Sequence, residues 1–410
     1  MKPVTLRPGI GDNRPSATLY YGQDVRETLR SLPEASIHTV CTSPPYWGLR
    51  DYGTATWEGG DAECDHLVRT ASTINASIES STLGGGKKTV GHSKEGFRTV
   101  CQRCGARRVD NQIGLEDNPD AFVTALVEVF REVKRVLRPD GTLWVNLGDS
   151  YAGGGRAGKN PDYQARHTMF GKEIDGSATG QFGVPMAVPE GLKPKDLVGI
   201  PWRVAFALQA DGWYLRSDIV WSKPSCMPES VTDRPTKAHE YVFLFAHPDS
   251  GGKYYYDATA VAEPLSEATT TDGRYNRSGD AETPYGATGS GKAAGLGRGP
   301  RTNGSGTRNK RSVWTVNPKP YTGSHFAVWP PDLVRPMILA GCPVGGTVLD
   351  PFSGSATTGM VAIQEGRNYI GTDLNPDYLP MAEARVREER PPDTVTEPDD
   401  GVLDLFGDDE

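Results

Sequence analysis

The chain has 410 residues, of which 36% are hydrophobic and 23% are charged, and its formal net charge is −8. This balance is typical of a globular protein, and the negative sum excludes a protein that binds nucleic acid through its overall charge alone. No apolar run reaches the roughly 20 residues that span a bilayer, and the first residues lack the apolar core of a signal peptide. We therefore expect a protein of the cytoplasm that has no membrane partner.

The first predicted elements are a short helix from Gln23 to Leu32 and a strand from Ile37 to Cys41. The strand runs directly into residues 42–47, which read TSPPYW. Proline cannot continue a paired strand because it lacks the N–H donor, and two large rings beside it are costly to leave in water. The stretch therefore predicts an abrupt strand end whose rings contact something.

Residues 54–115 form a polar insertion that carries a candidate metal site. Its ligands would be Cys64 and His66, which form a C-x-H pair, and Cys101 and Cys104, which begin a C-x-x-C-G sequence. Three thiolates and one imidazole suit the tetrahedral geometry of structural zinc. Alternatively, these are four unconnected residues in a reducing compartment.

The middle of the chain alternates helices with strands. Asn118 and Pro119 are a cap residue and a first-turn proline, and apolar residues follow at helical spacing up to Leu137. A turn is expected at Pro139–Gly141, and residues 150–195 form a Gly-rich insertion without periodicity. The further elements are a strand at Thr142–Leu147, a helix at Asp196–Ala210, and strands at Leu215–Trp221 and Tyr241–Ala246.

Residues 251–312 are rich in Gly, Ser, Thr and Arg, and we expect a flexible region. Between residues 292 and 311 there are six basic residues and no acidic one. A local basic segment can contact phosphates even in an acidic chain, although a solvated loop would have the same composition. The candidates for phosphate contact are Arg298, Arg301, Arg308, Lys310 and Arg311.

The last part of the chain predicts a ligand site between two strands. Its elements are a helix at Pro330–Ala340, a strand at Thr347–Asp350, a small-residue loop, a helix at Thr357–Gln364 and a strand at Asn368–Leu374. Small residues let the backbone approach a ligand, and an acid at the tip of the second strand can accept hydrogen bonds from ribose hydroxyls. The acid Asp350 would repel a pyrophosphate but suits a cationic ligand. The alternation of elements predicts an α/β fold, with a mostly parallel twisted sheet and helices on both faces.

Two stretches resemble those of a known family. Residues 350–358 (DPFSGSATT) resemble the S-adenosylmethionine motif of the DNA amino-methyltransferases, and residues 42–46 (TSPPY) resemble their catalytic motif. The catalytic motif comes first, as in the β group of that family, and the resemblance runs from Tyr20 to about Arg390. It implies a Rossmann-like methyltransferase fold that binds S-adenosylmethionine. The implied cofactor-binding residues are Asp24, Asp350, Pro351, Phe352, Ser353, Gly354, Ser355, Thr357 and Asp373.

Two of these positions need comment. Asp24 resembles the acid that contacts the cofactor adenine, but an Asp at the start of a helix is alternatively a cap. Ala356 stands where the loop of the family usually has Gly, so one backbone position is less permissive here.

The resemblance implies that the target base is flipped and methylated at its exocyclic amine. Ser43 Oγ and the Pro44 carbonyl would accept hydrogen bonds from the amine, and Pro44 and Pro45 would hold these acceptors rigidly. Tyr46 would stack on the base, and Trp47 would extend the stack or pack beneath it.

The identity of the base rests on one residue. The resemblance implies cytosine N4, because in the family Ser in the first motif position, here Ser43, goes mostly with cytosine N4 and Asp with adenine N6. Adenine N6 and an RNA substrate remain alternatives. Methylation at cytosine C5 is disfavoured, because that chemistry uses a Cys nucleophile, usually in a Pro-Cys pair, and the chain has no Pro-Cys pair.

Double-stranded DNA is the implied substrate, in a bacterial or phage-infected cell, and the basic residues named above would contact it. Residues 220–241 resemble the family segment that closes over the base, in which Lys223 or Arg234 would contact phosphates. The tail from Glu388 has ten acids and one basic residue, so we expect it to be disordered. Residues 403–406 (LDLF) resemble a peptide that binds bacterial sliding clamps, although so short a match also arises by chance. The clamp and a restriction endonuclease are candidate partners.

These expectations give a provisional organisation of the chain. In order, the segments are a catalytic half at 16–53, a zinc-binding insertion at 54–115, a methyltransferase core at 116–250 with its insertion at 150–195, a target-recognition region at 251–312, a cofactor-binding half at 313–388 and an acidic tail at 389–410.

Overall fold

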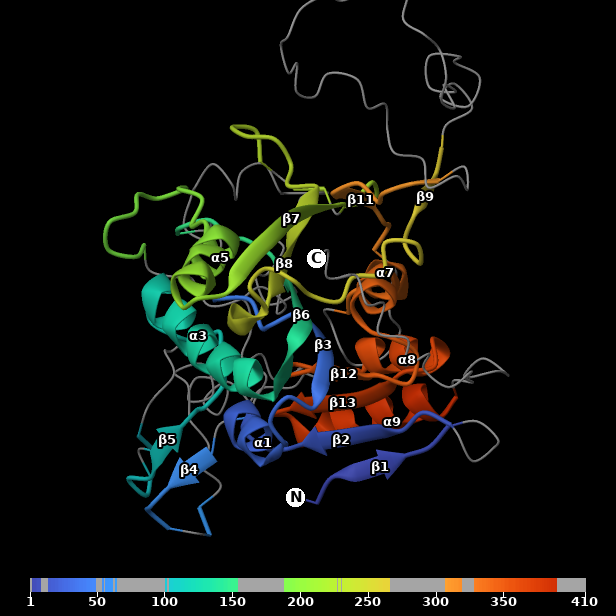
Figure 1. Cartoon of the computed structure of the whole chain (residues 1–410). Helices are drawn as coiled ribbons and strands as arrows, with labels where there is room; N and C mark the ends of the chain where they lie inside the picture. The colour runs from blue at the N-terminus through green and yellow to red at the C-terminus, as the bar shows by residue number, and fades with distance from the viewer. Residues whose placement is uncertain are drawn as a thin grey trace, which may run out of the picture.

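One mixed β-sheet forms the centre of the protein (Figure 1). The computed structural model describes residues 2–8, 14–48, 54, 56–61, 63–64, 100–101, 103–153, 188–226, 228–229, 231–265, 307–318 and 328–388. Among these residues the sheet has nine strands. From one edge to the other they are β1 (Val4–Leu6), β2 (Ala17–Tyr21), β13 (Asn368–Asp373), β12 (Thr347–Asp350), β3 (Ile37–Thr42), β6 (Leu137–Leu147), β8 (His239–Ala246), β7 (Tyr214–Ser222) and β11 (Val313–Thr315).

The prediction of a mostly parallel sheet is confirmed. Five neighbouring pairs are parallel, namely β2–β13, β13–β12, β12–β3, β3–β6 and β7–β11. Three pairs are antiparallel, namely β1–β2, β6–β8 and β8–β7. The five strands from β2 to β6 therefore end at the same edge of the sheet, where loops from distant parts of the chain meet.

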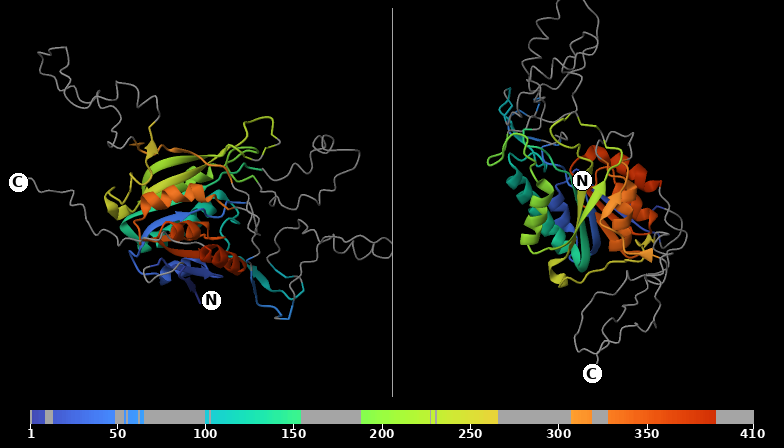
Figure 2. Two further views of the ribbon diagram at one scale, coloured as in Figure 1. Left: turned by 90° about the vertical axis from the view of Figure 1, so that its right-hand side faces the viewer. Right: turned by 90° about the horizontal axis from the view of Figure 1, so that it is seen from above.

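Helices cover both faces of the sheet, as the sequence predicted (Figure 2). One face carries α1 (Val25–Ser31), α3 (Pro119–Val136) and α5 (Ile200–Ala210). The other face carries α7 (Pro331–Gly341), α8 (Thr357–Gln364) and α9 (Leu379–Arg387). Each face has its own cluster of buried apolar side chains.

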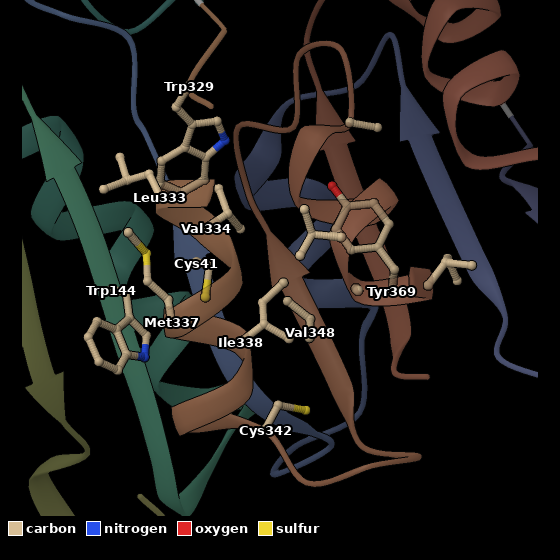
Figure 3. Close-up of a cluster of buried hydrophobic side chains, with 14 of the residues drawn as sticks. Cys41, Trp144, Trp329, Leu333, Val334, Met337, Ile338, Cys342, Val348 and Tyr369 are labelled. Atoms are coloured by element: carbon tan, nitrogen blue, oxygen red, sulfur yellow. The ribbon is translucent and has the colours of Figure 1, made fainter. Parts of the chain in front are cut away.

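Figure 3 shows how α7 is held against the sheet. Its residues Leu333, Val334, Met337 and Ile338 share one side of the helix and are fully buried. They pack in the same cluster as Trp144 of β6 and Val348 of β12. Each such side chain contributes about 1.5–3 kcal/mol when it leaves water. Cys41 lies in this cluster, and burial raises the pKa of its thiol well above the ordinary value.

The boundaries of α3 follow from its sequence. The Asn118 side chain accepts a hydrogen bond from the Ala121 N–H at 2.8 Å, and Pro119 occupies the first turn. The apolar residues at helical spacing, from Phe122 to Val133, are buried. The predicted cap, first-turn proline and buried face of this helix are therefore confirmed.

Two predicted boundaries differ most from the structure. Pro139–Gly141 is not a turn before a strand, because β6 already begins at Leu137 and bulges there: Ile37 pairs with Leu137, but Thr39 pairs with Thr142. The helix predicted from Asp196 begins at Ile200. Asp149 Oδ1 accepts hydrogen bonds from the N–H groups of Gly199 and Ile200 and so fixes the helix start.

Several short elements have no counterpart in the prediction. They are β1, β2, β11, α9, the pair β4 (Thr56–Glu58) and β5 (Arg107–Val109), the pair β9 (Glu263–Pro264) and β10 (Thr307–Arg308), and the 3-10 turns Pro248–Ser250 and Pro376–Tyr378. Four predicted features lie wholly or mostly outside the described residues: most of the Gly-rich insertion, most of the basic region, His66, and the acidic tail with its LDLF sequence. No helix in the described part of the chain is long and apolar enough to cross a membrane.

Candidate active site

The two sequence motifs meet at the carboxyl edge of the parallel strands. TSPPYW follows β3, the small-residue loop follows β12, and these strands are hydrogen-bonded neighbours. A direct contact joins the motifs, because Thr42 Oγ1 donates a hydrogen bond to Asp350 Oδ1 at 2.7 Å. The expectation that both motifs belong to one site thus has a physical basis.

Asp350 lies inside this junction. Its side chain is 1% exposed, Thr358 Oγ1 donates to its Oδ2 at 2.6 Å, and the Phe352 N–H donates to its Oδ1 at 3.1 Å. Burial raises the pKa of this carboxyl to about 6, although the three hydrogen bonds act in the opposite direction. Internal donors therefore hold the Asp350 side chain, which positions the loop, and a contact between Asp350 and a cofactor stays a prediction.

The small-residue loop is held from both sides. The hydroxyl of Tyr21 donates to the Gly354 carbonyl at 2.8 Å and lies 2.8 Å from Ser353 Oγ. On the other side, Arg385 Nη1 donates to Ser355 Oγ at 2.7 Å and to Thr357 Oγ1 at 2.9 Å. Pro351 and the side chains of Ser353, Ser355 and Thr357 are buried, and Phe352 is half-buried.

Ala356 adopts the left-handed conformation, with φ +58°, directly before α8. A side chain in that region costs about 1–2 kcal/mol compared with glycine. The departure from the family pattern at this position therefore falls on a residue whose backbone conformation favours glycine.

Asp373 is the residue best placed to contact a ligand with hydroxyl groups. Its Oδ2 accepts a hydrogen bond from the Gly354 N–H at 2.9 Å, and its Oδ1 accepts one from the Asn375 N–H at 2.8 Å. Each oxygen keeps a further lone pair, and the side chain is only half-buried. Desolvation first, and the nearby Asp350 in addition, raise the pKa of Asp373 to about 6.

Asp24 is a helix cap. Its Oδ1 accepts a hydrogen bond from the Arg26 N–H at 2.8 Å, and its Oδ2 lies 2.7 Å from Arg26 Nη2. Partial burial raises the pKa of Asp24, but the hydrogen bonds and charge of Arg26 outweigh it and hold that pKa below the ordinary value. The cap that the sequence offered as the alternative is thus present, and a contact between Asp24 and a cofactor stays a prediction.

The predicted catalytic stretch, residues 42–47 (TSPPYW), is tied to a polar residue that sequence reasoning missed. Asn146 lies in β6 at 1% exposure, and its Oδ1 accepts hydrogen bonds from Ser43 Oγ and from the Tyr46 hydroxyl, both at 3.2 Å. Its Nδ2 donates to the Tyr241 carbonyl at 3.0 Å. The available signal was an Asn inside the apolar run LWVNL, because a buried amide needs partners.

Glu240, at the start of β8, completes this network. Its Oε2 accepts a hydrogen bond from the Tyr46 hydroxyl at 2.6 Å and one from Asn146 Nδ2 at 3.3 Å. Its Oε1 pairs with Lys223, whose ammonium lies 4.0 Å from the centre of the Trp221 ring. Lys223, predicted to contact phosphates, is thus held between a carboxylate and an aromatic face.

The two rings of the stretch have different positions. Tyr46 is half-buried, and its ring lies so close to Gly148 that a Cβ there would be 2.4 Å from Cε2. Trp47 is 3% exposed, and its Nε1 donates to the Glu116 carbonyl at 2.8 Å. Trp47 belongs to the core on the α3 face, and its position relative to a flipped base stays a prediction.

The predicted metal ligands are brought together in part. The Sγ atoms of Cys64, Cys101 and Cys104 lie within 4.8 Å of one another, and His66 lies outside the described residues.

The basic residues lie partly in the described region. Arg308, Lys310 and Arg311 surround the carboxylate of Glu263 at 3.5, 3.9 and 2.8 Å, whereas Arg298 and Arg301 lie outside it. These three cations around the Glu263 carboxylate leave a positive excess that can bind an anion.

Arg234 lies elsewhere in the described region. It pairs with Glu229 at 2.5 Å, and its guanidinium lies 3.8 Å from the centre of the Tyr151 ring.

Comparison with known proteins identifies the relatives of this chain. The family model described as DNA methylase matches residues 37–384. The type II methyltransferase M.Cfr9I of Citrobacter freundii is 40% identical over 373 residues, which cover 91% of this chain and 88% of that protein. M.SmaI of Serratia marcescens is 38% identical over 367 residues, 90% of each chain. Among solved structures, the cytosine-N4-specific PvuII DNA methyltransferase is similar at a TM-score of 0.48, with 17% identity, covering 92% of this chain and 88% of that one.

The buried charge of Asp350 generates a pH-dependent prediction. Because its pKa is about 6 in the folded protein and 3.8 ordinarily, the folded state binds the proton more tightly than the unfolded state. The stability that this proton provides is fully present below about pH 4 and is lost as the pH rises through about 6. Asp350→Asn has no such charge. The free energy of unfolding of both proteins is measured in urea at about pH 4.5 and about pH 7.5. Relative to the wild type, the value for Asp350→Asn should be higher by about 1–3 kcal/mol at the higher pH than at the lower pH.

Asp140→Asn provides the control for this measurement. The hydrogen bond and charge of Arg138 lower the pKa of Asp140, so that variant should lose stability relative to the wild type as the pH rises. A difference between wild type and Asp350→Asn that is independent of pH would contradict the role assigned to Asp350.

Proposed function

The chain belongs to the DNA methylase family of N6 and N4 methyltransferases, and on that premise we propose that it methylates cytosine N4 in double-stranded DNA. It is a type II DNA methyltransferase. Its methyl donor is S-adenosylmethionine, the cofactor on which the family depends.

The residues around the small-residue loop fit this cofactor. S-adenosylmethionine supplies an electrophilic methyl group on a positively charged sulfur. Asp373 offers two lone pairs to ribose hydroxyls, and the backbone at Gly354 is fixed by the hydrogen bonds to Asp373 and Tyr21. Asp350 holds the loop from inside through Thr358 and Phe352.

The observation that carries the choice of cytosine N4 is the hydroxyl of Ser43. Since this hydroxyl donates its own proton to Asn146 Oδ1, its lone pairs face outward as acceptors for an amine N–H. The rigid Pro44 carbonyl is the second acceptor. Two such acceptors pull the amine toward tetrahedral geometry, and its lone pair then points at the methyl group. A strong base is unnecessary, because the amine loses its proton after the methyl group has arrived.

The surroundings of Ser43 also favour a neutral residue there. Glu240 and Ser43 both hydrogen-bond to the side-chain amide of Asn146. An Asp at position 43 would therefore place a second negative charge in the same small network, which would be unfavourable. Adenine N6 and RNA remain the alternatives that the product assay separates.

Tyr46 supplies the aromatic face for the flipped base. Its hydroxyl is fixed by Glu240 and Asn146, and its ring lies against Gly148. The ring orientation is therefore set before the base arrives, so that stacking, worth about 1–3 kcal/mol per base, is opposed by little ordering cost.

Contacts with DNA are proposed for the basic residues. Arg308, Lys310 and Arg311 keep a net positive charge around Glu263, which suits the phosphate backbone. Arg298 and Arg301 are proposed to extend this surface. A restriction endonuclease as a functional partner, and a sliding clamp bound through residues 403–406, also remain proposals.

The decisive experiment identifies the product. Purified protein is incubated with DNA and isotopically labelled S-adenosylmethionine, the DNA is digested, and the modified nucleoside is identified by mass spectrometry. The expected product is N4-methylcytosine, made on duplex DNA and not on RNA of the same sequence. N6-methyladenine would overturn the choice of base, and the absence of transfer to any DNA would overturn the proposed function.

Gly148→Ala should damage catalysis without affecting cofactor binding. The added methyl group would lie 2.4 Å from Tyr46 Cε2, so the ring must move and lose its hydroxyl contacts. We expect methyl transfer to fall about 5–150-fold, the equivalent of about 1–3 kcal/mol, with an unchanged dissociation constant for S-adenosylmethionine. Tyr46→Phe, which keeps the ring but not the hydroxyl, should lose less. Full activity of Gly148→Ala would refute the role of the Tyr46 ring.

Cofactor binding should strengthen between pH 5 and pH 7. The carboxylate of Asp373 accepts hydroxyl protons only when ionised, and its pKa is about 6. The dissociation constant for S-adenosylmethionine, measured by calorimetry, should be about tenfold lower at about pH 7 than at about pH 5. Asp373→Asn should bind weakly at both pH values. Asp24→Asn should keep the slope, because the pKa of Asp24 lies below its ordinary value. An unaltered slope in Asp373→Asn would assign the titration to another group.

A further inference from the structure

The polar insertion ends in a cluster of three thiols. Cys64 comes from its first segment, and Cys101 and Cys104 come from its last, yet the three Sγ atoms lie within 4.8 Å of one another. The Sγ atoms of Cys64 and Cys101 are 3.9 Å apart. That distance far exceeds a disulfide bond of about 2.05 Å, but it is close to the spacing of two sulfurs on one tetrahedral zinc with Zn–S bonds of about 2.3 Å.

The backbone directs the thiols of Cys101 and Cys104 to the same side. The Gly105 N–H donates to the Cys101 carbonyl at 2.8 Å, and the Cys101 N–H donates to the Ala106 carbonyl at 2.7 Å. Gly105 has a φ of +75°, which glycine adopts without strain. The result is the tight C-x-x-C-G turn that directs two cysteine side chains at one metal ion.

The first segment approaches this turn closely. A Cβ on Gly60 would be 2.7 Å from Cys104 Sγ, so only glycine permits this distance. The Cys64 N–H donates to the Asp61 carbonyl at 3.0 Å and closes a second turn. Both segments are thus shaped around the sulfurs, not merely adjacent to them.

Among the described residues of the insertion, apolar packing alone is too small to hold the chain in place. The strands β4 and β5 pair over three residues, and the local cluster of buried residues consists of Cys64, Cys101 and Ala106, with Trp57 and Cys104 at its margin. A single pair of short strands with so little buried surface is not stable by itself, and small units of this kind usually depend on a cross-link or a metal.

The chain that leaves the cluster returns to the catalytic stretch. The Gly48 N–H donates to the Gly114 carbonyl at 2.8 Å, and Trp47 Nε1 donates to the Glu116 carbonyl at 2.8 Å. The Gly114 N–H in turn donates to the Glu116 carboxylate at 2.9 Å. Residues 114–116 therefore support the end of TSPPYW through these hydrogen bonds.

We propose that Cys64, Cys101 and Cys104 bind one structural Zn²⁺, which fixes the insertion and through residues 114–116 braces the catalytic stretch. Binding replaces the three thiol protons, which are released to solvent, so the metal affinity falls at low pH. His66, the fourth ligand expected from the sequence, lies outside the described residues, and the proposal rests on the three cysteines.

The metal content of the full-length protein tests the site, independently of its activity. After gel filtration, elemental mass spectrometry should find about one zinc per chain, as in a Cys-rich structural site. Cys101→Ser and Cys104→Ser should retain less than about a tenth of that amount. The matched control is Cys226→Ser, a half-exposed cysteine outside the cluster, which should retain all of it. The absence of zinc from the wild type, or full zinc in Cys101→Ser, would overturn the proposal.

A second measurement avoids variants that fail to fold. Zinc in the wild-type protein is replaced by Co²⁺, whose absorption spectrum reports thiolate ligands and tetrahedral geometry. A spectrum without thiolate bands would reject the cysteine site.

Hydrogen exchange tests the bracing. Removal of zinc by a chelator should accelerate exchange of the Gly48 amide, which is bonded to Gly114, by more than about tenfold. Affinity for S-adenosylmethionine should be unchanged, because residues 114–116 are bonded to Trp47 and Gly48, whereas the loop after β12 is held by Tyr21, Asp373 and Arg385. Unchanged protection of Gly48 in the metal-free protein would refute the bracing.

Discussion

The carboxylate of Asp350 is the contact on which the two-part site depends. It binds Thr42 at the end of β3 and Thr358 in α8, and it also fixes the first N–H of the loop that follows β12. The catalytic stretch and the cofactor loop therefore share one anchor, although they are 308 residues apart in the chain. A buried carboxylate is tolerated here because three donors converge on it, and the loss of any one would leave it poorly satisfied.

The direction of β8 makes possible the hydrogen-bond network in which Asn146 and Glu240 hold Ser43 and Tyr46. Because β8 runs antiparallel to β6, its first residues lie beside the last residues of β6, with Tyr241 opposite Leu147. Glu240 is thereby delivered to the same edge as Ser43 and Tyr46. A parallel strand in that place would bring its final residues there instead, so the antiparallel pair at this position is part of the construction of the site.

Sequence reasoning was most accurate where local signals were complete. The bounds of β12 and α8 were predicted to the residue, because a short apolar strand, a small-residue loop and a helix follow one another without interruption. It failed where partners are remote. The strand β2 is recognisable mainly through its pairing with β13, and Trp47 is buried by a stretch that lies 69 residues further on. Asn146 was missed because a single polar residue does not disturb an apolar pattern.

The position of β3 between β6 and β12 has a consequence for the making of the protein. One edge of β3 can pair only when β12 has been synthesised, 308 residues after Thr42. At about 5–20 residues per second a ribosome needs roughly 15–60 s for that length. During this time β3 has an open edge, which is the kind of surface that chaperones protect. The nascent chain therefore acquires the proposed methyl-transfer site only near the end of translation, when the last strands close the sheet.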